Sequence, residues 1–355
     1  MLALLVQRDL RTKLNTKREI TWKMLSLETF SGNMAEIITP EEFNNLSGKK
    51  VTAYCGFEPS GIPHIAIGLM WPKKFNEVSG MGIDLTILLA DWHAMINDKL
   101  GGDLEAIRKS GEQIRKSMLA VGLSEKVKFT WAKDLVSDPD YWEMFLRVAK
   151  ASSLTRLRRS LPIMGRTEEE ADKDFSKYIY PIMQVTDIFY LDVDIALGGM
   201  DQRHAHMLAR DVADKLKKKK VVCAHAPLMG SLKGSGRMDT FVKMSKSDPG
   251  AAILMSDSLQ EISEKMKKAF CPMKQKENNP VLDIFHYIIF PWNGTVTIER
   301  PIGKGGDISF GTFPELEKEY SEGNIHPIDL KEAATISLDK LVAPARKVLL
   351  ADSGQ

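Results

Sequence analysis

Short apolar segments rich in β-branched residues recur along the first two thirds of the chain and alternate with segments of helical periodicity. Strands that alternate with helices in this way form a parallel sheet that is covered by helices on both faces. We therefore expect an α/β fold with a doubly wound parallel sheet. The five predicted strands are Val51–Cys55, Leu85–Ala90, Val127–Trp131, Val193–Leu197 and Val221–Cys223.

The same pattern divides the chain into three parts. Residues 1–24 form a basic extension, which is a targeting peptide, an arm that contacts RNA phosphates, or a dispensable leader with Met24 as an alternative start. A catalytic domain is expected over 25–248. It opens with a helical stretch over Leu25–Leu46 that restarts at Thr39-Pro40, and it contains an arginine-rich helical insertion at about 141–166. Residues 249–355 are predicted to form a mainly helical C-terminal domain.

Composition narrows the class of protein. With 43% hydrophobic and 27% charged residues the chain is globular, and a net charge of +2 confines any basic surface to a local patch. No run reaches the roughly 18 apolar residues of a membrane span. The three cysteines lack metal-ligand spacing, so we expect no metal site and reduced thiols in a cytoplasmic protein. They are Cys55, Cys223 and Cys271.

A turn rich in glycine, proline and serine follows the first predicted strand. It runs from Gly56 to Gly61 and leads through His64 into a helical segment that starts near Leu69. A strand, loop and helix in this order present free backbone amides to an anion. The glycine spacing differs from the dinucleotide pattern, so NAD is not predicted.

Three polar side chains share one face of the predicted helical segment from Tyr178 to Tyr190. Tyr180, Gln184 and Asp187 are spaced i, i+4 and i+7 among apolar neighbours. Such a stripe is either the solvated side of a surface helix, which would favour Lys and Glu, or a site for an ammonium group and a hydroxyl group. A buried Asp187 would need a ligand or a donor such as Tyr54, because an unpaired buried carboxylate is costly.

A basic pentapeptide, Lys243-Met244-Ser245-Lys246-Ser247, precedes Asp248-Pro249-Gly250 and is predicted to be a mobile loop. Lysine-rich loops are often merely solvated. Two lysines at this spacing also suit a phosphate whose charge shifts during a reaction.

Six motifs in order resemble the tyrosyl-tRNA synthetases of the archaeal and eukaryotic type, over roughly residues 25–345. The resemblance implies a Rossmann-type catalytic domain, a C-terminal helical anticodon domain and a homodimer. It also implies L-tyrosine, ATP with Mg²⁺ and tRNA(Tyr) as reactants, and no tightly bound cofactor. The motifs are Y-x-G-F-E-P-S-G from Tyr54, L-L-A-D-W-H from Leu88, Y-P-I-M-Q-V-x-D-I from Tyr180, G-G-M-D-Q-R from Gly198, K-M-S-K-S from Lys243 and H-P-x-D-L-K from His326.

The resemblance also assigns roles to individual residues. The phenolic hydroxyl of the substrate would bond to Tyr54 and Asp187, and Lys243 and Lys246 would stabilise the departing pyrophosphate. The other tyrosine-binding positions are Gly56, Glu58, Tyr180, Gln184 and Gln202. ATP would be held by His64, Gly68 and Asp201, with His64 also catalytic, and tRNA by Arg158, Arg159, Arg203, His326 and Asp329.

Three positions depart from the family pattern. Ala66 and Ile67 replace the last two residues of the class signature H-I-G-H, so ATP binding is expected to be weaker. Lys304 replaces an aromatic residue, so a phosphate contact is expected there.

The alternative functions are those of a tryptophanyl-tRNA synthetase, a non-catalytic tRNA-binding paralogue and a small-molecule nucleotidyltransferase. For the cluster from Arg156 to Arg159, which includes Arg158, the alternative to a tRNA contact is a solvated helix face. The histidines His93, His206, His225 and His286 are expected to be structural.

Overall fold

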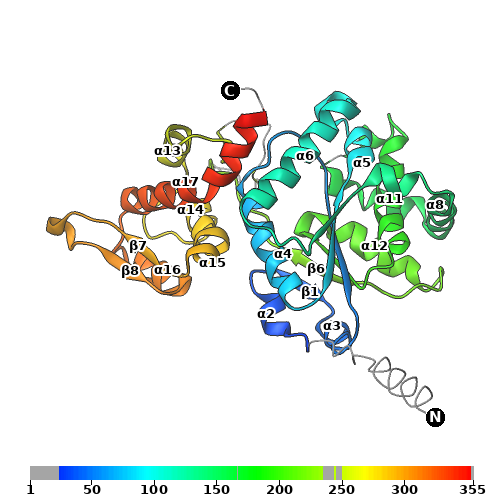
Figure 1. Ribbon diagram of the computed structural model, residues 1–355, viewed down its shortest axis with the longest axis horizontal. Coiled ribbons are helices and arrows are strands. Elements are labelled where there is room, and N and C mark those ends of the chain that lie inside the picture. The colour runs from blue at the N-terminus through cyan, green and yellow to red at the C-terminus, as the bar shows by residue number, and fades with distance from the viewer. Residues whose placement is uncertain (1–23, 166, 235–243, 245–249, 353–355) are drawn as a thin grey trace, which may run out of the picture.

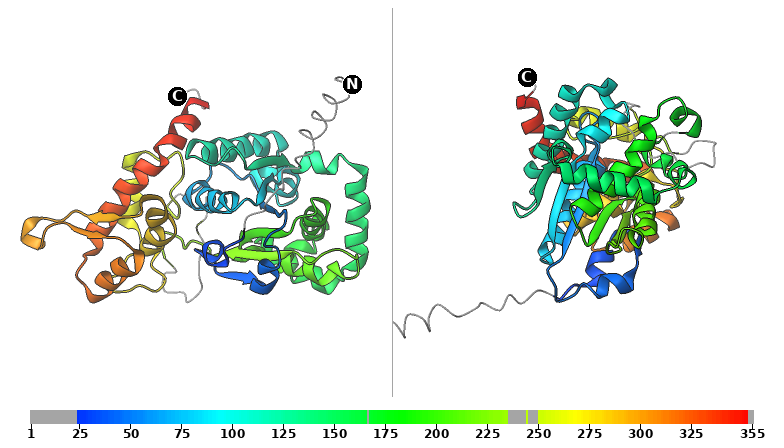
Figure 2. Two further views of the ribbon diagram at one scale, coloured as in Figure 1. Left: turned by 60° about the horizontal axis from the view of Figure 1, so that its bottom comes forward. Right: turned by 90° about the vertical axis from the view of Figure 1, so that its right-hand side faces the viewer.

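The computed structural model of the chain describes residues 24–165, 167–234, 244 and 250–352 (Figure 1). The basic extension at 1–23 lies outside the described residues, as do Lys243 and Lys246. Two bodies lie side by side along the long axis, one built on a sheet and the other mostly helical (Figure 2). No helix among the described residues is long and apolar enough to cross a membrane.

The first body is built on a six-stranded sheet in the order β1-β6-β5-β2-β3-β4. Strands β2 to β6 run parallel, as predicted, and β1 pairs antiparallel with β6 at one edge. The fold class is therefore confirmed. The strands are β1 (Glu36–Ile38), β2 (Thr52–Phe57), β3 (Asp84–Leu89), β4 (Lys128–Trp131), β5 (Ile195–Gly199) and β6 (Val222–Ala226).

Strand β1 corrects the prediction of a helix over Leu25–Leu46. Only α2 (Leu27–Ser31) and α3 (Pro40–Asn44) are helical there. Thr39 caps α3, with Pro40 in its first turn, as the sequence predicts. Three residues are too few to reveal a period, and the pairing of β1 with β6 decides its conformation.

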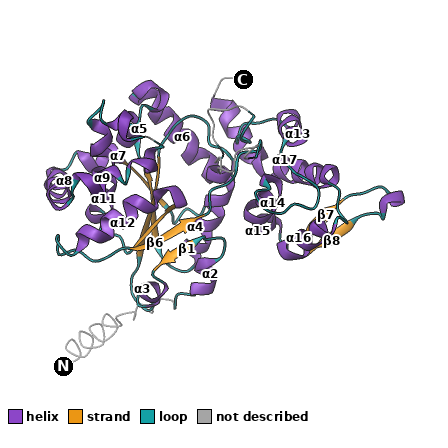
Figure 3. Cartoon of the chain, turned by 180° about the vertical axis from the view of Figure 1, so that it is seen from behind, coloured by secondary structure: helices purple, strands orange, loops and turns teal. Residues whose placement is uncertain are grey.

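Helices cover both faces of the sheet (Figures 1 and 3). In β2, Ala53, Cys55 and Phe57 contribute to one apolar core and Tyr54 to the other, as the alternation of side chains along a strand requires. The helices of this body are α4 (Trp71–Gly80), α5 (Asp91–Ile96), α6 (Leu104–Ala120), α7 (Ala132–Val136), α8 (Pro139–Ala151), α9 (Leu154–Arg158), α10 (Glu168–Ala171), α11 (Ser176–Tyr190) and α12 (Arg203–Ala213), with shorter turns at η1 (Ala66–Met70), η2 (Lys99–Gly102), η3 (Leu161–Met164) and η4 (Met200–Gln202).

The second body contains a β-hairpin that the sequence prediction of mainly helical structure misses. Its strands β7 (Val296–Ile298) and β8 (Ile308–Phe310) flank a turn that contains Gly303, Gly305 and Gly306 (Figure 3). The indole of Trp292 donates to the carbonyl of Leu69 at 3.1 Å and ties the two bodies together. The helices are α13 (Leu259–Lys268), α14 (Pro280–Ile284), α15 (Phe290–Asn293), α16 (Phe313–Glu322) and α17 (Pro327–Asp352), with short turns η5 (Phe285–Ile289) and η6 (Ile302–Lys304).

Candidate active site

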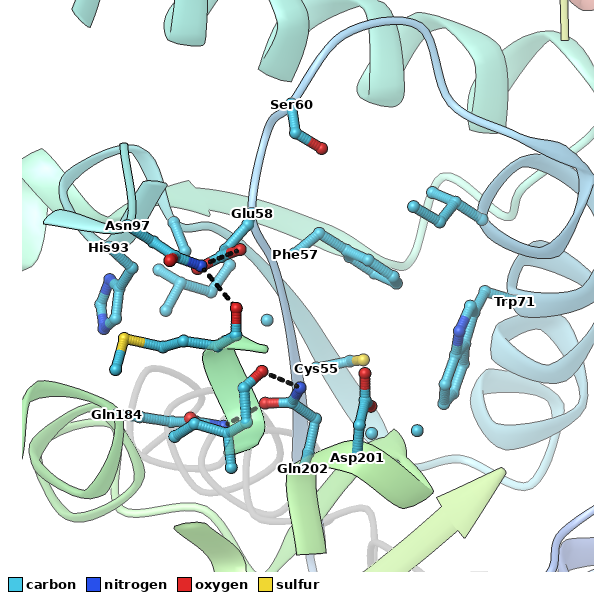
Figure 4. Close-up of a pocket in the computed structure, with 18 of the residues that line it drawn as sticks. Cys55, Phe57, Glu58, Ser60, Trp71, His93, Asn97, Gln184, Asp201 and Gln202 are labelled. Carbon is cyan, nitrogen blue, oxygen red and sulfur yellow. Dashed lines mark hydrogen bonds between the residues drawn. The ribbon is translucent and has the colours of Figure 1, made fainter. Parts of the chain in front are cut away.

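A cavity of about 820 Å³ opens at the carboxyl ends of the parallel strands (Figure 4). The chain order reverses between β5 and β2, and open parallel sheets bind ligands at such a switch point. The cavity is lined by nine of the predicted site residues. These are Tyr54, Gly56, Glu58, His64, Tyr180, Gln184, Asp187, Asp201 and Gln202.

One end of the cavity holds a buried carboxylate. Asp187 on α11 and Tyr54 on β2 are each 1% exposed. The hydroxyl of Tyr141 donates to Oδ1 of Asp187 at 2.8 Å, and Nε2 of His93 lies 3.0 Å from Oδ2. The partners of Asp187 are therefore Tyr141 and His93, which corrects the expectation that Tyr54 supplies the donor.

The environment keeps both tyrosine hydroxyls protonated. Burial, reinforced by the charge of Asp187, raises the pKa of Tyr54 well above its usual range. Burial and the charge of Asp187 also raise the pKa of Tyr141, and the hydrogen bond to Asp187 adds to the effect. Burial opposes protonation of His93, but the charge and bonding of Asp187 outweigh it and raise the His93 pKa. A carboxylate with donors around it and a protonated phenol beside it can bind a hydroxyl group that both donates and accepts.

The middle of the cavity presents carboxylate, amide and phenol groups. The amide of Gln184 donates to Oε1 of Gln202 at 3.0 Å. On another wall, the Asn97 amide lies 3.1 Å and 3.2 Å from the two oxygens of Glu58 (Figure 4). Burial and the neighbouring Glu58 raise the pKa of Tyr180 well above its usual range. Oxygen acceptors gathered in this way suit an ammonium group.

Sequence reasoning missed Tyr141, His93 and Asn97. His93 was expected to be structural, yet it lines the cavity. Asn97 is 1% exposed and also donates to the carbonyl of Met164 at 3.2 Å, so it links Glu58 to the helical insertion. His93 lies three residues after the predicted strand Leu85–Ala90, near the carboxyl end of that strand, which was a usable signal. Tyr141 and Asn97 reach the site only through tertiary packing.

The other end of the cavity lies beside the turn after β2. His64, Ala66, Ile67 and Trp71 line one side of it, and Asp201 lines another. His64 lies two residues before Ala66, the first residue of the π-helical turn η1, and Ile65 between them is its N-cap. Met244, between the two lysines of the basic pentapeptide, also lines the cavity and donates its N–H to the carbonyl of Met229 at 2.8 Å.

Gly68 is not among the residues that line this cavity, and its contact with ATP stays a prediction. A side chain on Gly68 would overlap Met255. The N–H of Met255 donates to the carbonyl of Pro63 at 2.9 Å, and the N–H of Ile65 donates to the carbonyl of Ile253 at 3.0 Å. Gly68 therefore lets the segment that follows the basic pentapeptide pack against the segment that carries His64.

The residues predicted to contact tRNA lie away from the cavity lining. Arg159 and His326 are exposed, and Nε of Arg203 donates to Oε1 of Glu36 at 2.7 Å. Nη2 of Arg158 lies 3.7 Å from Oδ1 of Asp172. His326 precedes α17 and accepts from the N–H of Ile328 at 3.2 Å, while Asp329 lies in the first turn of that helix.

Comparison with known proteins agrees with this geometry. The family model for tRNA synthetases class I (W and Y) matches residues 46–343, so the chain belongs to this class of enzyme. The tyrosine–tRNA ligase of Picrophilus torridus is 54% identical over 93% of this chain and 100% of its own length. That of Aeropyrum pernix is 49% identical over 90% of this chain and 92% of its own length.

Solved structures give the same result. The tyrosyl-tRNA synthetase of Pyrococcus horikoshii, complexed with L-tyrosine, superposes with a TM-score of 0.86 at 38% identity, covering 93% of this chain and 98% of its own. That of Aeropyrum pernix gives 0.83 at 46% identity, covering 92% and 95%. A tryptophanyl-tRNA synthetase from Aeropyrum pernix, 18% identical with a TM-score of 0.64, shares the fold. Within its class, the chain is a member of the tyrosyl-tRNA synthetase family.

Proposed function

We infer that the chain is a tyrosine–tRNA ligase, which activates L-tyrosine with ATP and transfers it to the 3′ end of tRNA(Tyr). The observation that carries this inference is the buried pair of Tyr54 and Asp187 at the closed end of the cavity, which suits a phenol and not an indole. The relatives named tyrosine–tRNA ligase support it.

The proposed reaction has two steps. The carboxylate of tyrosine attacks the α-phosphorus of ATP, the bond to pyrophosphate breaks, and tyrosyl-adenylate forms. The terminal ribose hydroxyl of tRNA then attacks the tyrosyl carbonyl and releases AMP. Positioning and charge stabilisation supply the catalysis, so no protein nucleophile is needed.

Each end of the cavity has a role in this proposal. Tyr54 and Asp187 hold the phenol, and His64 and Asp201 hold the phosphates and the ribose of ATP. The ammonium and carboxylate end of tyrosine is held by Glu58, Tyr180, Gln184 and Gln202, with Gly56 in the cavity floor. Lys243 and Lys246 stabilise pyrophosphate. No cluster of three or more metal-ligating side chains occurs among the described residues, and we propose that Mg²⁺ enters with ATP as part of that substrate.

ATP–pyrophosphate exchange separates this function from its alternatives. The chain should catalyse exchange with tyrosine and not with tryptophan. A tryptophanyl-tRNA synthetase would show the reverse preference, and a non-catalytic tRNA-binding paralogue would show no exchange with either amino acid.

Ile67 places an apolar side chain at the nucleotide end of the cavity. Replacing Ile67 with His should raise kcat/KM for ATP in the exchange assay by about tenfold or more, because a hydrogen bond to a charged phosphate contributes about 1.5–3 kcal/mol. Ile67→Leu is the matched apolar control. A rate for Ile67→His equal to that of Ile67→Leu would show that the departure from the class signature does not weaken ATP binding.

Residues outside the cavity are proposed to bind tRNA. We propose that residues 249–355 form the anticodon-binding domain, with Asp329 accepting from a base and His326 stacking or bonding beside it. Lys304 would contact a phosphate. Arg158, Arg159 and Arg203 would contact the acceptor stem. A cytoplasmic location fits the use of tRNA and the three free thiols.

We also propose a homodimer formed through the helical insertion. Trp142 and Leu146 on α8 and Leu154 on α9 are 38%, 66% and 55% exposed, and these helices lie at the end of the molecule opposite the C-terminal body (Figure 1). Leu146→Glu should raise the dimer dissociation constant by about 100-fold in sedimentation equilibrium, because it buries an unpaired charge. Leu259→Glu, at an exposed leucine of α13, is the control. If Leu146→Glu sediments with the same mass as the unmodified protein, this surface is not the dimer interface.

A further inference from the structure

A buried pair of histidines lies beside strand β1, one on β6 and one on α12, and the proposed reaction does not use it. His206 and His225 are 1% and 0% exposed, and their rings stack with centroids 5.0 Å apart. Nδ1 of His206 lies 2.9 Å from Nε2 of His225. Nδ1 of His225 lies 2.8 Å from Oε1 of Glu36, the oxygen to which Arg203 also donates. The four side chains form one connected row, which ends at the molecular surface on Arg203.

The fold fixes this row at three places. Glu36 on β1 lies directly opposite His225 on β6, and the N–H of Ala35 donates to the carbonyl of His225 at 2.7 Å. His206 lies one helical turn after Arg203 on α12. Gly198 lets α12 approach the sheet, because a side chain there would lie 3.2 Å from the ring of His206.

The protonation of the two rings gives the row a direction. Burial and the neighbouring His225 lower the pKa of His206 to about 3, and burial also lowers the pKa of His225. Both rings are therefore neutral near pH 7, and each has one donor and one acceptor nitrogen. If Nδ1 of His225 donates toward Glu36, its Nε2 accepts from Nδ1 of His206. This order places the Glu36 carboxylate between His225 and Arg203.

We propose that Glu36 is a positioning residue for tRNA, which holds the guanidinium of Arg203 in the orientation that meets the acceptor stem. The proposal rests on the proposed role of Arg203. A free arginine side chain loses rotamer entropy on binding, and one that is already fixed has less to lose. Gln202, directly before Arg203, lines the tyrosine cavity, so the same short segment orients both the amino acid and the acceptor end.

A neighbouring ion pair supplies a matched control. Glu42 on α3 makes two hydrogen bonds to Arg210 on α12, at 2.7 Å and 3.0 Å. Like Glu36, it joins the N-terminal segment to α12, but it has no contact with Arg203 in the described structure. If Glu36 only fastens this segment, the two substitutions Glu36→Gln and Glu42→Gln should behave alike.

The test measures aminoacylation and ATP–pyrophosphate exchange in parallel. Glu36→Gln keeps the size of the side chain and removes its charge. It should raise KM for tRNA(Tyr) about tenfold, with exchange unchanged within twofold. Glu42→Gln should leave both reactions unchanged. Arg203→Ala should also raise KM for tRNA(Tyr), and the double variant Glu36→Gln/Arg203→Ala should be no worse than Arg203→Ala alone.

Each other outcome has a separate meaning. A normal KM for Glu36→Gln beside a raised KM for Arg203→Ala would overturn the positioning role and keep that of Arg203. A normal KM for Arg203→Ala would overturn both. An equal loss in Glu42→Gln, or a matching loss of exchange in Glu36→Gln, would show a structural effect and overturn the proposal. Absence of tyrosine-dependent exchange in the unmodified chain would instead contradict the proposed function.

Discussion

Asp187→Asn should lower kcat/KM for tyrosine in ATP–pyrophosphate exchange by about 100- to 1000-fold. Asp187 is buried and has two partners within the protein, Tyr141 and His93, so its charge is oriented before the substrate binds. Removing one member of a buried charged pair costs about 3–5 kcal/mol, and 1.4 kcal/mol corresponds to a factor of ten. Asn keeps the shape of the side chain and an oxygen acceptor for Tyr141.

Tyr141→Phe is the companion variant. It removes one donor to Asp187 and leaves the carboxyl group in place, so a loss of about tenfold is expected. Thermal unfolding of both variants separates a loss of binding from a loss of folding. Exchange by Asp187→Asn within threefold of the unmodified rate would show that the carboxylate does not hold the substrate.

Tyr54→Phe should abolish most of the preference for tyrosine over phenylalanine. A preference of about 10⁴–10⁵ is a known property of tyrosyl-tRNA synthetases. A pocket without polar partners distinguishes a hydroxyl only by about 10². Tyr54 is 1% exposed and protonated, so its hydroxyl would be left without the substrate phenol when phenylalanine binds. The ratio of kcat/KM for the two amino acids in exchange measures the effect.

Tyr180→Phe is the control for this experiment. It removes a hydroxyl from the part of the cavity that is proposed to bind the ammonium group, which both amino acids share. Its kcat/KM should fall for tyrosine and phenylalanine alike, with the ratio unchanged. A full preference retained by Tyr54→Phe would place the discrimination elsewhere.

Sequence periodicity and the order of the motifs predict most of the strands and helices that carry the site residues. The five parallel strands follow from β-branched runs between helical segments, and Gln184 and Asp187 share a helix face because their spacing requires it. Strand β1 and the hairpin of β7 and β8 have strands of three residues each, too short for any period to appear.

The partners of the site residues follow only from the tertiary structure. Asp187 and Tyr141 are separated by 46 positions, and Glu58 and Asn97 by 39. No local pattern reports which distant donor reaches a buried carboxylate. Gly68 gives a second example, because a methionine from a distant segment occupies the space next to this glycine and no local pattern predicts that contact.

The most direct test of the account is a crystal structure of the chain with L-tyrosine bound. The account predicts that the phenolic oxygen lies within about 2.5–3.0 Å of both Oη of Tyr54 and the carboxylate of Asp187. It also predicts that the amino group of the substrate faces Tyr180 and Gln184. A tyrosine bound in the reverse orientation, or with its ring outside this cavity, would contradict it.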